Sequence, residues 1–225
     1  MEEMERKPVA EPAETEPAPE AAAAPETVQE DTERAPERIP GRELYEWISS
    51  CVSAVLIIVL IFTFGVRMMG VKGPSMRQTL QEGDRLLVLN SLLVKEYRQG
   101  DIVIARKESF SEEPIVKRVI AVAGQTVDID FDSGIVYVDG TALEEDYVND
   151  LTYTEEGTQF PLTVPEDSVF LMGDNRNMST DSRDERIGTL DTRYLIGKAV
   201  FLLFPGPDYV TEERDFSRIG SLSRG

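Results

Sequence analysis

Residues 47–66 read WISSCVSAVLIIVLIFTFGV, an apolar run without a charged side chain between Glu46 and Arg67. At a helical rise of about 1.5 Å per residue, this run matches the roughly 30 Å hydrocarbon core of a bilayer. A buried core helix is usually shorter and polar on one face. A cleaved secretory signal is not expected, because a long acidic region precedes the run and residues 68–70 offer no small-x-small cleavage site. The run therefore predicts an uncleaved transmembrane signal anchor over residues 43–70.

The region before the anchor, residues 1–42, is rich in Glu, Pro and Ala and contains almost no larger apolar side chains. Such a segment cannot bury enough surface to offset its ordering entropy, so we predict a disordered acidic tail. The whole chain of 225 residues has a net charge of −19 and 42 acidic against 23 basic residues, so nucleic acid is not expected as a partner. The single cysteine, Cys51, lies inside the apolar run, which excludes an intrachain disulfide.

Beyond Leu80 the pattern changes to short apolar and β-branched runs separated by turn residues. The predicted strands are residues 86–89, 101–105, 115–120, 127–132, 135–138, 168–172 and 195–204. Strict alternation over 127–132, a turn at Ser133-Gly134 and the return over 135–138 indicate a β-hairpin. The sequence thus predicts a mostly β fold: an antiparallel β domain over residues 71–210 on one N-terminal transmembrane helix, with a C-terminal tail at 211–225.

The predicted hairpin carries an acidic pattern that imitates a calcium-binding loop. Asp128, Asp130, Asp132 and Asp139 have spacing like that of an EF-hand, but the required glycine position holds Ser133 and no amphipathic helix flanks it. A period of two instead places the first three aspartates on one solvated strand face. We expect neither a metal ion nor a cofactor.

The stretch 71–80, VKGPSMRQTL, places one serine, Ser75, shortly after the anchor. Gly73 and Pro74 let the backbone approach a substrate closely and can present N–H groups to a developing oxyanion. The chain contains no histidine, so a Ser-His-Asp triad within it is excluded and a nucleophilic Ser75 would need another base, such as a buried lysine. Taken alone, the same stretch also fits an ordinary loop serine.

Lys117 is the strongest candidate for that base. It stands beside Arg118 in IVKRVI, residues 115–120, and two adjacent cations inside a strand are unusual. An inward-facing lysine would be desolvated, which favours its neutral, basic form. The alternative is an edge strand whose two cations both reach water. The rival bases are Lys72, Lys95, Lys107 and Lys198.

A third stretch, MGDNRNMSTDSR at residues 172–183, combines small polar residues with two aspartates and two arginines, as in a turn held by buried ion pairs. The three stretches, in this order after a membrane anchor, closely resemble the bacterial type I signal peptidases. The resemblance covers roughly residues 44–205.

The resemblance implies a signal peptidase or repressor-protease-like fold and a catalytic Ser/Lys dyad, with Ser75 as nucleophile and Lys117 as general base. It further implies that Ser179 orients the lysine, that Asp181 and Arg183 form a supporting buried pair, and that the Ser75 N–H is part of the oxyanion hole. The candidate pocket residues are Met76, Leu80 and Val116.

Two positions depart from the family pattern. Gly73 stands where some members add a serine hydroxyl to the oxyanion hole, and Gln78 stands where proline is usual. The second departure leaves the rigidity of the turn in doubt, whereas the chemistry does not depend on it.

By the same resemblance, the substrates are preproteins whose signal peptides are cut after small residues in an Ala-x-Ala pattern. The catalytic domain is expected outside the cytoplasm, against membrane lipid, with a cytoplasmic N-terminus and a monomeric chain. Basic residues lie on both sides of the apolar run, so charge alone does not decide the orientation. Two alternatives remain open: a self-cleaving Ser/Lys protease of the repressor type, and a membrane-tethered β module that binds a partner.

Overall fold

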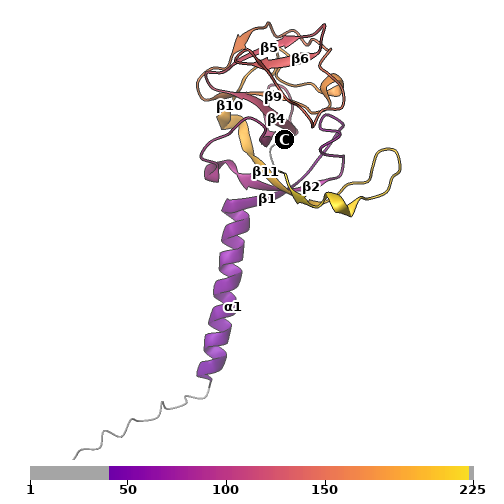
Figure 1. Ribbon diagram of the computed structural model, residues 1–225. Coiled ribbons are helices and arrows are strands. Elements are labelled where there is room, and N and C mark those ends of the chain that lie inside the picture. Colours follow the sequence, from indigo (N-terminus) through magenta and orange to yellow (C-terminus); the bar gives the residue numbers. More distant parts are fainter. Residues whose placement is uncertain (1–40, 223–225) are drawn as a thin grey trace, which may run out of the picture. The chain divides into compact units, whose positions relative to one another are not determined.

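The computed structural model describes residues 41–222, and the chain divides into units of residues 1–45 and 46–225. The predicted acidic tail lies almost wholly outside the described residues, and the first unit is described only where helix α1 (Arg42–Leu60) begins. The π-helical turn η1 (Ile61–Gly65) continues α1 (Figure 1). Together they form a helix of 24 residues that is long and apolar enough to cross a membrane and has exposed side chains over that apolar length.

The predicted anchor range 43–70 includes a strand, which corrects its C-terminal boundary. Strand β1 (Val66–Gly70) pairs antiparallel with β2 (Arg85–Asn90), in a register that joins Val66 to Leu89 and Gly70 to Arg85. The helix ends here because β2 offers backbone partners at its free edge and Met69 packs against the core. The chain therefore enters the β domain five residues earlier than the anchor range implies.

The larger sheet has eight strands in the order β1-β2-β11-β3-β4-β9-β10, with β12 also paired to β11, and its neighbours are antiparallel (Figure 1). Its remaining strands are β3 (Ile102–Ala105), β4 (Ile115–Val122), β9 (Ser168–Met172), β10 (Leu190–Asp191), β11 (Leu195–Phe204) and β12 (Gly220–Ser221). The short helical turns are η2 (Ser91–Leu93), η3 (Arg176–Met178), η4 (Thr192–Tyr194) and η5 (Phe216–Arg218). The predicted mostly antiparallel β architecture is confirmed.

The smaller sheet has four strands in the order β7-β6-β5-β8: Thr141–Ala142, Ile135–Val138, Thr126–Asp130 and Leu162–Thr163. The predicted hairpin is confirmed as β5 and β6. Asp128 and Asp130 lie on the exposed strand face, but Asp132 lies in the turn. The Asp130 carboxylate accepts hydrogen bonds from the backbone of Asp132 and from the backbone and hydroxyl of Ser133, so it shapes the turn.

The domain was predicted to end at residue 210, and the structure corrects this boundary as well. Residues 216–221 form η5 and β12, which pairs with β11. The Arg218 guanidinium lies 2.7 Å from the buried carboxylate of Asp84, which also accepts a hydrogen bond from the Gly206 N–H. A buried carboxylate needs such partners, and this one attaches the C-terminal segment to the domain.

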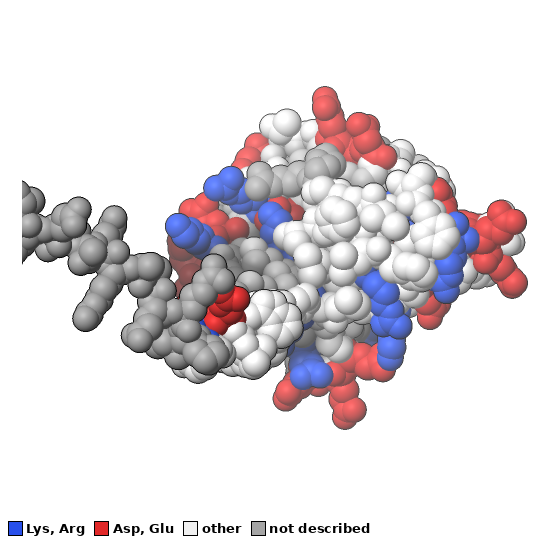
Figure 2. Space-filling view, turned by 90° about the horizontal axis from the view of Figure 1, so that it is seen from below, with Lys and Arg blue, Asp and Glu red and all other residues white. Residues whose placement is uncertain are grey.

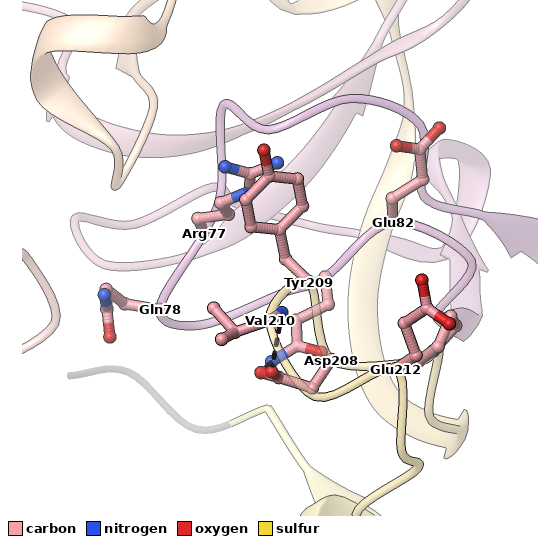
Figure 3. Close-up of a pocket in the computed structure, with 9 residues that line it drawn as sticks. Arg77, Gln78, Glu82, Asp208, Tyr209, Val210 and Glu212 are labelled. Atoms are coloured by element: carbon pink, nitrogen blue, oxygen red, sulfur yellow. Dashed lines mark hydrogen bonds between the residues drawn. The ribbon is translucent and has the colours of Figure 1, made fainter.

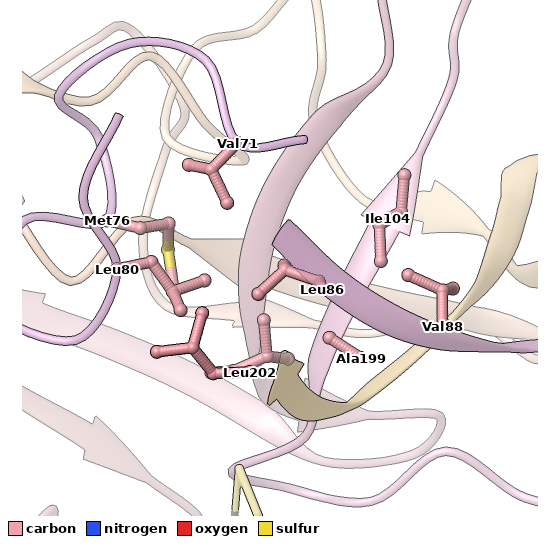
Figure 4. Close-up of a cluster of buried hydrophobic side chains, with 9 residues drawn as sticks. Val71, Met76, Leu80, Leu86, Val88, Ile104, Ala199 and Leu202 are labelled. Carbon is pink, nitrogen blue, oxygen red and sulfur yellow. The ribbon is translucent and has the colours of Figure 1, made fainter. Parts of the chain in front are cut away.

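Three clusters of buried apolar side chains hold the domain together. One lies between the two sheets and one beside strands β3, β9 and β10. The third packs the loop after β1 against β2, β3 and β11, and Figure 4 shows Met76 and Leu80 of that loop directed toward Leu86 and Leu202. This third cluster fixes the loop that carries Ser75.

Candidate active site

The loop between β1 and β2 leaves Ser75 partly accessible next to the buried Met76. Gly73 takes a positive φ of 77°, and the Arg77 N–H donates to the Pro74 carbonyl at 3.0 Å, which closes a turn around Ser75. Met76 anchors this turn in the core and is 1% exposed, whereas Ser75 is half-buried. The hydroxyl therefore belongs to a fixed backbone with one accessible side.

The predicted pocket of Met76, Leu80 and Val116 needs a correction. Met76 and Leu80 are 1% and 0% exposed, because the Leu80 N–H donates to the Met76 carbonyl in one helical turn that directs both side chains into the core. Both side chains support the turn that carries Ser75 from the core side, and they do not line an open pocket. Val116 is half-buried and lines a cavity of about 130 Å³ together with Met69 and Ile104.

Lys117 lies on β4, between β3 and β9 in the middle of the larger sheet, and is 3% exposed. This position excludes the edge-strand interpretation. Within residues 41–222, no hydrogen bond or ion pair joins its side-chain nitrogen to another residue. Burial lowers the pKa of Lys117 to about 8, while the carboxylates of Asp181 and Glu156 act in the opposite direction. Near physiological pH this lysine is still mostly protonated, but its neutral fraction is far larger than that of a lysine with the ordinary pKa.

Gly173 relates the positions of Ser75 and Lys117 to each other. The antiparallel register of β4 and β9, continued by one residue, sets Lys117 opposite Gly173, and opposite residues project from the same face of a sheet. A Cβ atom at Gly173 would collide with the Ser75 carbonyl oxygen and with Ser179 Oγ. Ser75 and Ser179 therefore lie on the face toward which Lys117 projects.

Ser179, Asp181 and Arg183 form one buried hydrogen-bonded group beside this point. The Ser179 hydroxyl donates to Asp181 Oδ2 at 2.8 Å, and the Gly173 N–H donates to the same oxygen at 2.9 Å. Arg183 Nε lies 2.9 Å from Asp181 Oδ1, and both side chains are 0% exposed. Because Ser179 donates its proton to Asp181, its oxygen lone pairs are available to a donor such as Lys117.

Sequence reasoning assigned no role to Asn175, which ties the two loops of the site together. Its N–H donates to the Ser75 carbonyl at 3.0 Å, and its side-chain amide donates to the Pro74 carbonyl at 3.1 Å. It belongs to the Gly-Asp-Asn-Arg motif, so the motif was visible although the contact was not. Asn175 holds the backbone of Pro74 and Ser75 against the loop after β9.

The other unassigned contacts belong to Arg118 and Asp174. Arg118 donates twice to the Asp174 carboxylate, at 2.8 and 2.7 Å, and once to the Gly100 carbonyl at 3.0 Å. Thr79 Oγ1 also donates to Asp174, at 2.5 Å, which links this ion pair to the turn that carries Ser75. The Arg118 guanidinium lies 3.8 Å from the ring centroid of Tyr147, a residue that no sequence pattern singled out.

The four rival lysines lie in other surroundings. Lys72 is exposed and pairs with Glu113 at 2.6 Å, and Lys198 pairs with Asp101 at 2.6 Å. Lys107 donates to two backbone carbonyls, and Lys95 is exposed. Of the five candidate bases, Lys117 is the one that is both buried and free of an ion pair within the described chain.

The turn that carries Ser75 also leaves a backbone donor unused. In the part of the chain that the structure describes, the Ser75 N–H donates to no backbone or side-chain acceptor. A larger cavity of about 760 Å³ lies on the other side of this turn, between Arg77 and Gln78 and the segment Pro207–Glu212 (Figure 3). The Arg77 guanidinium lies 3.7 Å from the ring centroid of Tyr209 there. Cavities are therefore lined by residues that precede and follow Ser75 in the chain.

Comparison with known proteins identifies similar chains. A family model described as "Signal peptidase, peptidase S26" matches residues 44–204. Signal peptidase I of Bacillus licheniformis is 35% identical over 72% of this chain and 89% of its own length. Signal peptidase I T of Bacillus subtilis is 35% identical over 71% and 85%, and a probable signal peptidase I-1 of Synechocystis is 34% identical over 74% and 85%. A crystal structure of a signal peptidase I from Enterococcus faecalis is 31% identical, with 47% and 97% coverage and a TM-score of 0.39.

Proposed function

The chain belongs to the signal peptidase family, peptidase S26, whose members remove signal peptides from preproteins as serine endopeptidases, and from this membership we propose that Ser75 and Lys117 are its catalytic dyad. The observation that carries the proposal is the convergence at Gly173. There a buried lysine without an ion pair projects toward the face that holds Ser75 and Ser179. The resemblance of the surrounding motifs to the family supports the same assignment.

In the mechanism that follows, neutral Lys117 accepts the Ser75 proton as the hydroxyl oxygen attacks the scissile carbonyl. The Ser75 N–H donates to the oxyanion, and the lysine ammonium then gives its proton to the leaving amine. Water, activated by the same lysine, hydrolyses the acyl-enzyme. Ser179 orients the lysine through its free lone pairs, and the Asp181–Arg183 pair holds Ser179 in place.

The cavity beside Val116 supports cleavage after small residues in an Ala-x-Ala pattern. It has a volume of about 130 Å³, and its apolar walls of Met69, Ile104 and Val116 suit the methyl group of an alanine side chain. We assign the pocket to Val116 and its neighbours, and we give Met76 and Leu80 the role of supporting the floor beneath them.

We further propose a single-pass topology with the N-terminus in the cytoplasm and a monomeric catalytic domain outside it, resting on lipid. Exposed apolar side chains support the lipid contact: Leu92 is 80% exposed, and Leu93 approaches Gly65 at the end of the apolar helix. Figure 2 shows an uncharged area on one face of the molecule, with both basic and acidic side chains around it.

The low pKa of Lys117 predicts a pH profile. Because the neutral amine is the reactive form and the pKa lies at about 8, kcat/KM should level off above that pH and fall about tenfold per pH unit below it. The measurement is kcat/KM of the detergent-solubilised full chain, between about pH 6 and pH 10, on a peptide without ionisable groups in that range. A rate that does not vary across this range would remove Lys117 from the role of general base.

Product analysis tests the proposed function directly. The full chain is incubated with a preprotein that carries an Ala-x-Ala site, and the cut position is read by mass spectrometry. An acylating inhibitor is then added, and the modified residue is mapped. We expect cleavage after the second alanine and acylation at Ser75. Cleavage of the chain itself would instead support a repressor-type protease, and an inert but folded chain would support a binding module.

A further inference from the structure

We propose that Glu156 is a positioning residue of this site, whose carboxylate provides the counter-charge for Lys117 while that lysine carries the serine proton. The inference rests on the proposed dyad of Ser75 and Lys117 and adds a residue outside the three sequence motifs.

The segment around Glu156 lies along the loop that carries Ser179, Asp181 and Arg183. The Asp181 N–H donates to Glu156 Oε2 at 3.3 Å, and the Thr158 N–H donates to the Arg183 carbonyl at 2.9 Å. Gly157 also forms an isolated antiparallel bridge with Asp184. These contacts on both sides of Glu156 fix its backbone, so its carboxylate is held beside the catalytic loop.

Four charged groups act electrostatically on the pKa of Lys117: Asp181, Glu156, Arg183 and Asp174. Two of the three carboxylates are already compensated. Asp181 is paired with Arg183 at 2.9 Å, and Asp174 forms a bidentate pair with a buried arginine. Glu156 differs, because within residues 41–222 no lysine or arginine lies within ion-pair distance of its carboxylate. Among the three carboxylates, Glu156 is therefore the one without an ion-pair partner; Arg186, itself paired with Asp184, also interacts with it electrostatically.

The placement of Glu156 is unfavourable for the carboxylate itself. Glu156 is half-buried, and its pKa is raised by burial and by the Asp181 carboxylate, whereas Arg183 acts in the opposite direction and Asp184 adds a further negative charge. A glutamate side chain of ordinary flexibility would avoid such a position in favour of water. A positive charge at Lys117 would relieve this repulsion, so the two groups stabilise each other once the lysine is protonated.

This relation has a consequence for the reaction. Proton transfer from Ser75 creates an ammonium ion in a desolvated site, and a fixed carboxylate lowers the free energy of that state. The same charge also favours protonation of the resting lysine. Removing the charge should therefore extend activity to lower pH and, at the same time, reduce the maximal rate.

The experiment compares kcat/KM profiles of the full-length wild type, Glu156→Gln and Glu155→Gln in detergent, between about pH 6 and pH 10. Glutamine keeps an acceptor for the Asp181 N–H, and the neighbouring Glu155 is an exposed control of the same chemistry. For Glu156→Gln we expect the fall in rate at acid pH to begin at lower pH, and the plateau to drop by roughly three- to tenfold. Glu155→Gln should match the wild type, and Glu156→Asp should recover part of the plateau.

A Glu156→Gln profile that superimposes on that of the wild type, or that moves to higher pH, would overturn the inference. Loss of folding in Glu156→Gln, detected by circular dichroism, would also overturn it, because the role would then be structural. Failure of the dyad itself is a separate result, since it would abolish or flatten the pH profile of the wild type. The two failures are thus distinguishable.

Discussion

Lys117→Met should leave the protein folded and reduce preprotein cleavage by about 10²- to 10⁴-fold or more, the typical contribution of a general base. Methionine preserves the length and much of the volume of the side chain, so the packing of β4 between β3 and β9 should survive. The loss would therefore report chemistry. Without the amine, the Ser75 hydroxyl has no base, because the chain contains no histidine and the rival lysines lie in other surroundings.

The matched control is Lys72→Met. Lys72 is close to Ser75 in sequence, but its side chain is 71% exposed and pairs with Glu113. Cleavage of an Ala-x-Ala preprotein is followed by mass spectrometry for both variants, with circular dichroism as the check on folding. Full activity in Lys117→Met together with loss of activity in Lys72→Met would transfer the role of base to Lys72.

The turn at Gln78 shows how the sequence can raise a question that only the structure answers. The family usually has proline at this position, and the substitution left the rigidity of the turn in doubt. Gln78 adopts a φ of 90°, in the left-handed region, whereas a proline ring fixes φ near −65°. This turn thus takes a path that proline could not follow. Its rigidity comes from the buried Met76 and Leu80 and from Asn175.

The motifs carried most of what could be predicted about the site. The three stretches around Ser75, Lys117 and Ser179 were recognisable because their residue types occur in a fixed order, and the strands because hydrophobic alternation is local. Glu156 and Tyr147 had no such signal. Their roles depend on loops that return to the site from a distance along the chain, and no local period encodes that return. The short strands β7, β8, β10 and β12 were missed for a similar reason, since two residues carry no pattern.

The boundaries were the weakest part of the sequence prediction. Residues 66–70, VRMMG, directly follow the apolar run and are themselves apolar except for Arg67, so composition alone could not separate the end of the anchor from an edge strand. The segment 216–221 has little hydrophobic pattern, and it is fixed by the ion pair of Arg218 with Asp84. In both places a contact between distant residues, and not a local preference, decides the structure.

Asp174→Asn should lower the free energy of unfolding by about 3–5 kcal/mol, the usual cost of breaking a buried ion pair by removing one partner. The side chains of Arg118 and Asp174 are 2% and 0% exposed, so the substitution leaves a buried guanidinium without a counter-charge. Asparagine keeps the shape of aspartate and its one oxygen can still accept from Thr79, so the change removes the charge and one hydrogen bond from Arg118. The same variant should also lose activity, because Thr79 and Asn175 connect this pair to the turn that carries Ser75.

Asp191→Asn provides the control, since Asp191 also forms a bidentate pair, with Arg193, but at the surface: the arginine side chain is 85% exposed. An exposed pair is screened by water and contributes little, so this variant should unfold like the wild type. Guanidinium-induced unfolding of the detergent-solubilised full chains, followed by circular dichroism, gives both values. Equal midpoints for the two variants would show that burial of the Arg118–Asp174 pair does not contribute to stability. The turn that carries Ser75 would then have to be held by the buried Met76 and Leu80 alone.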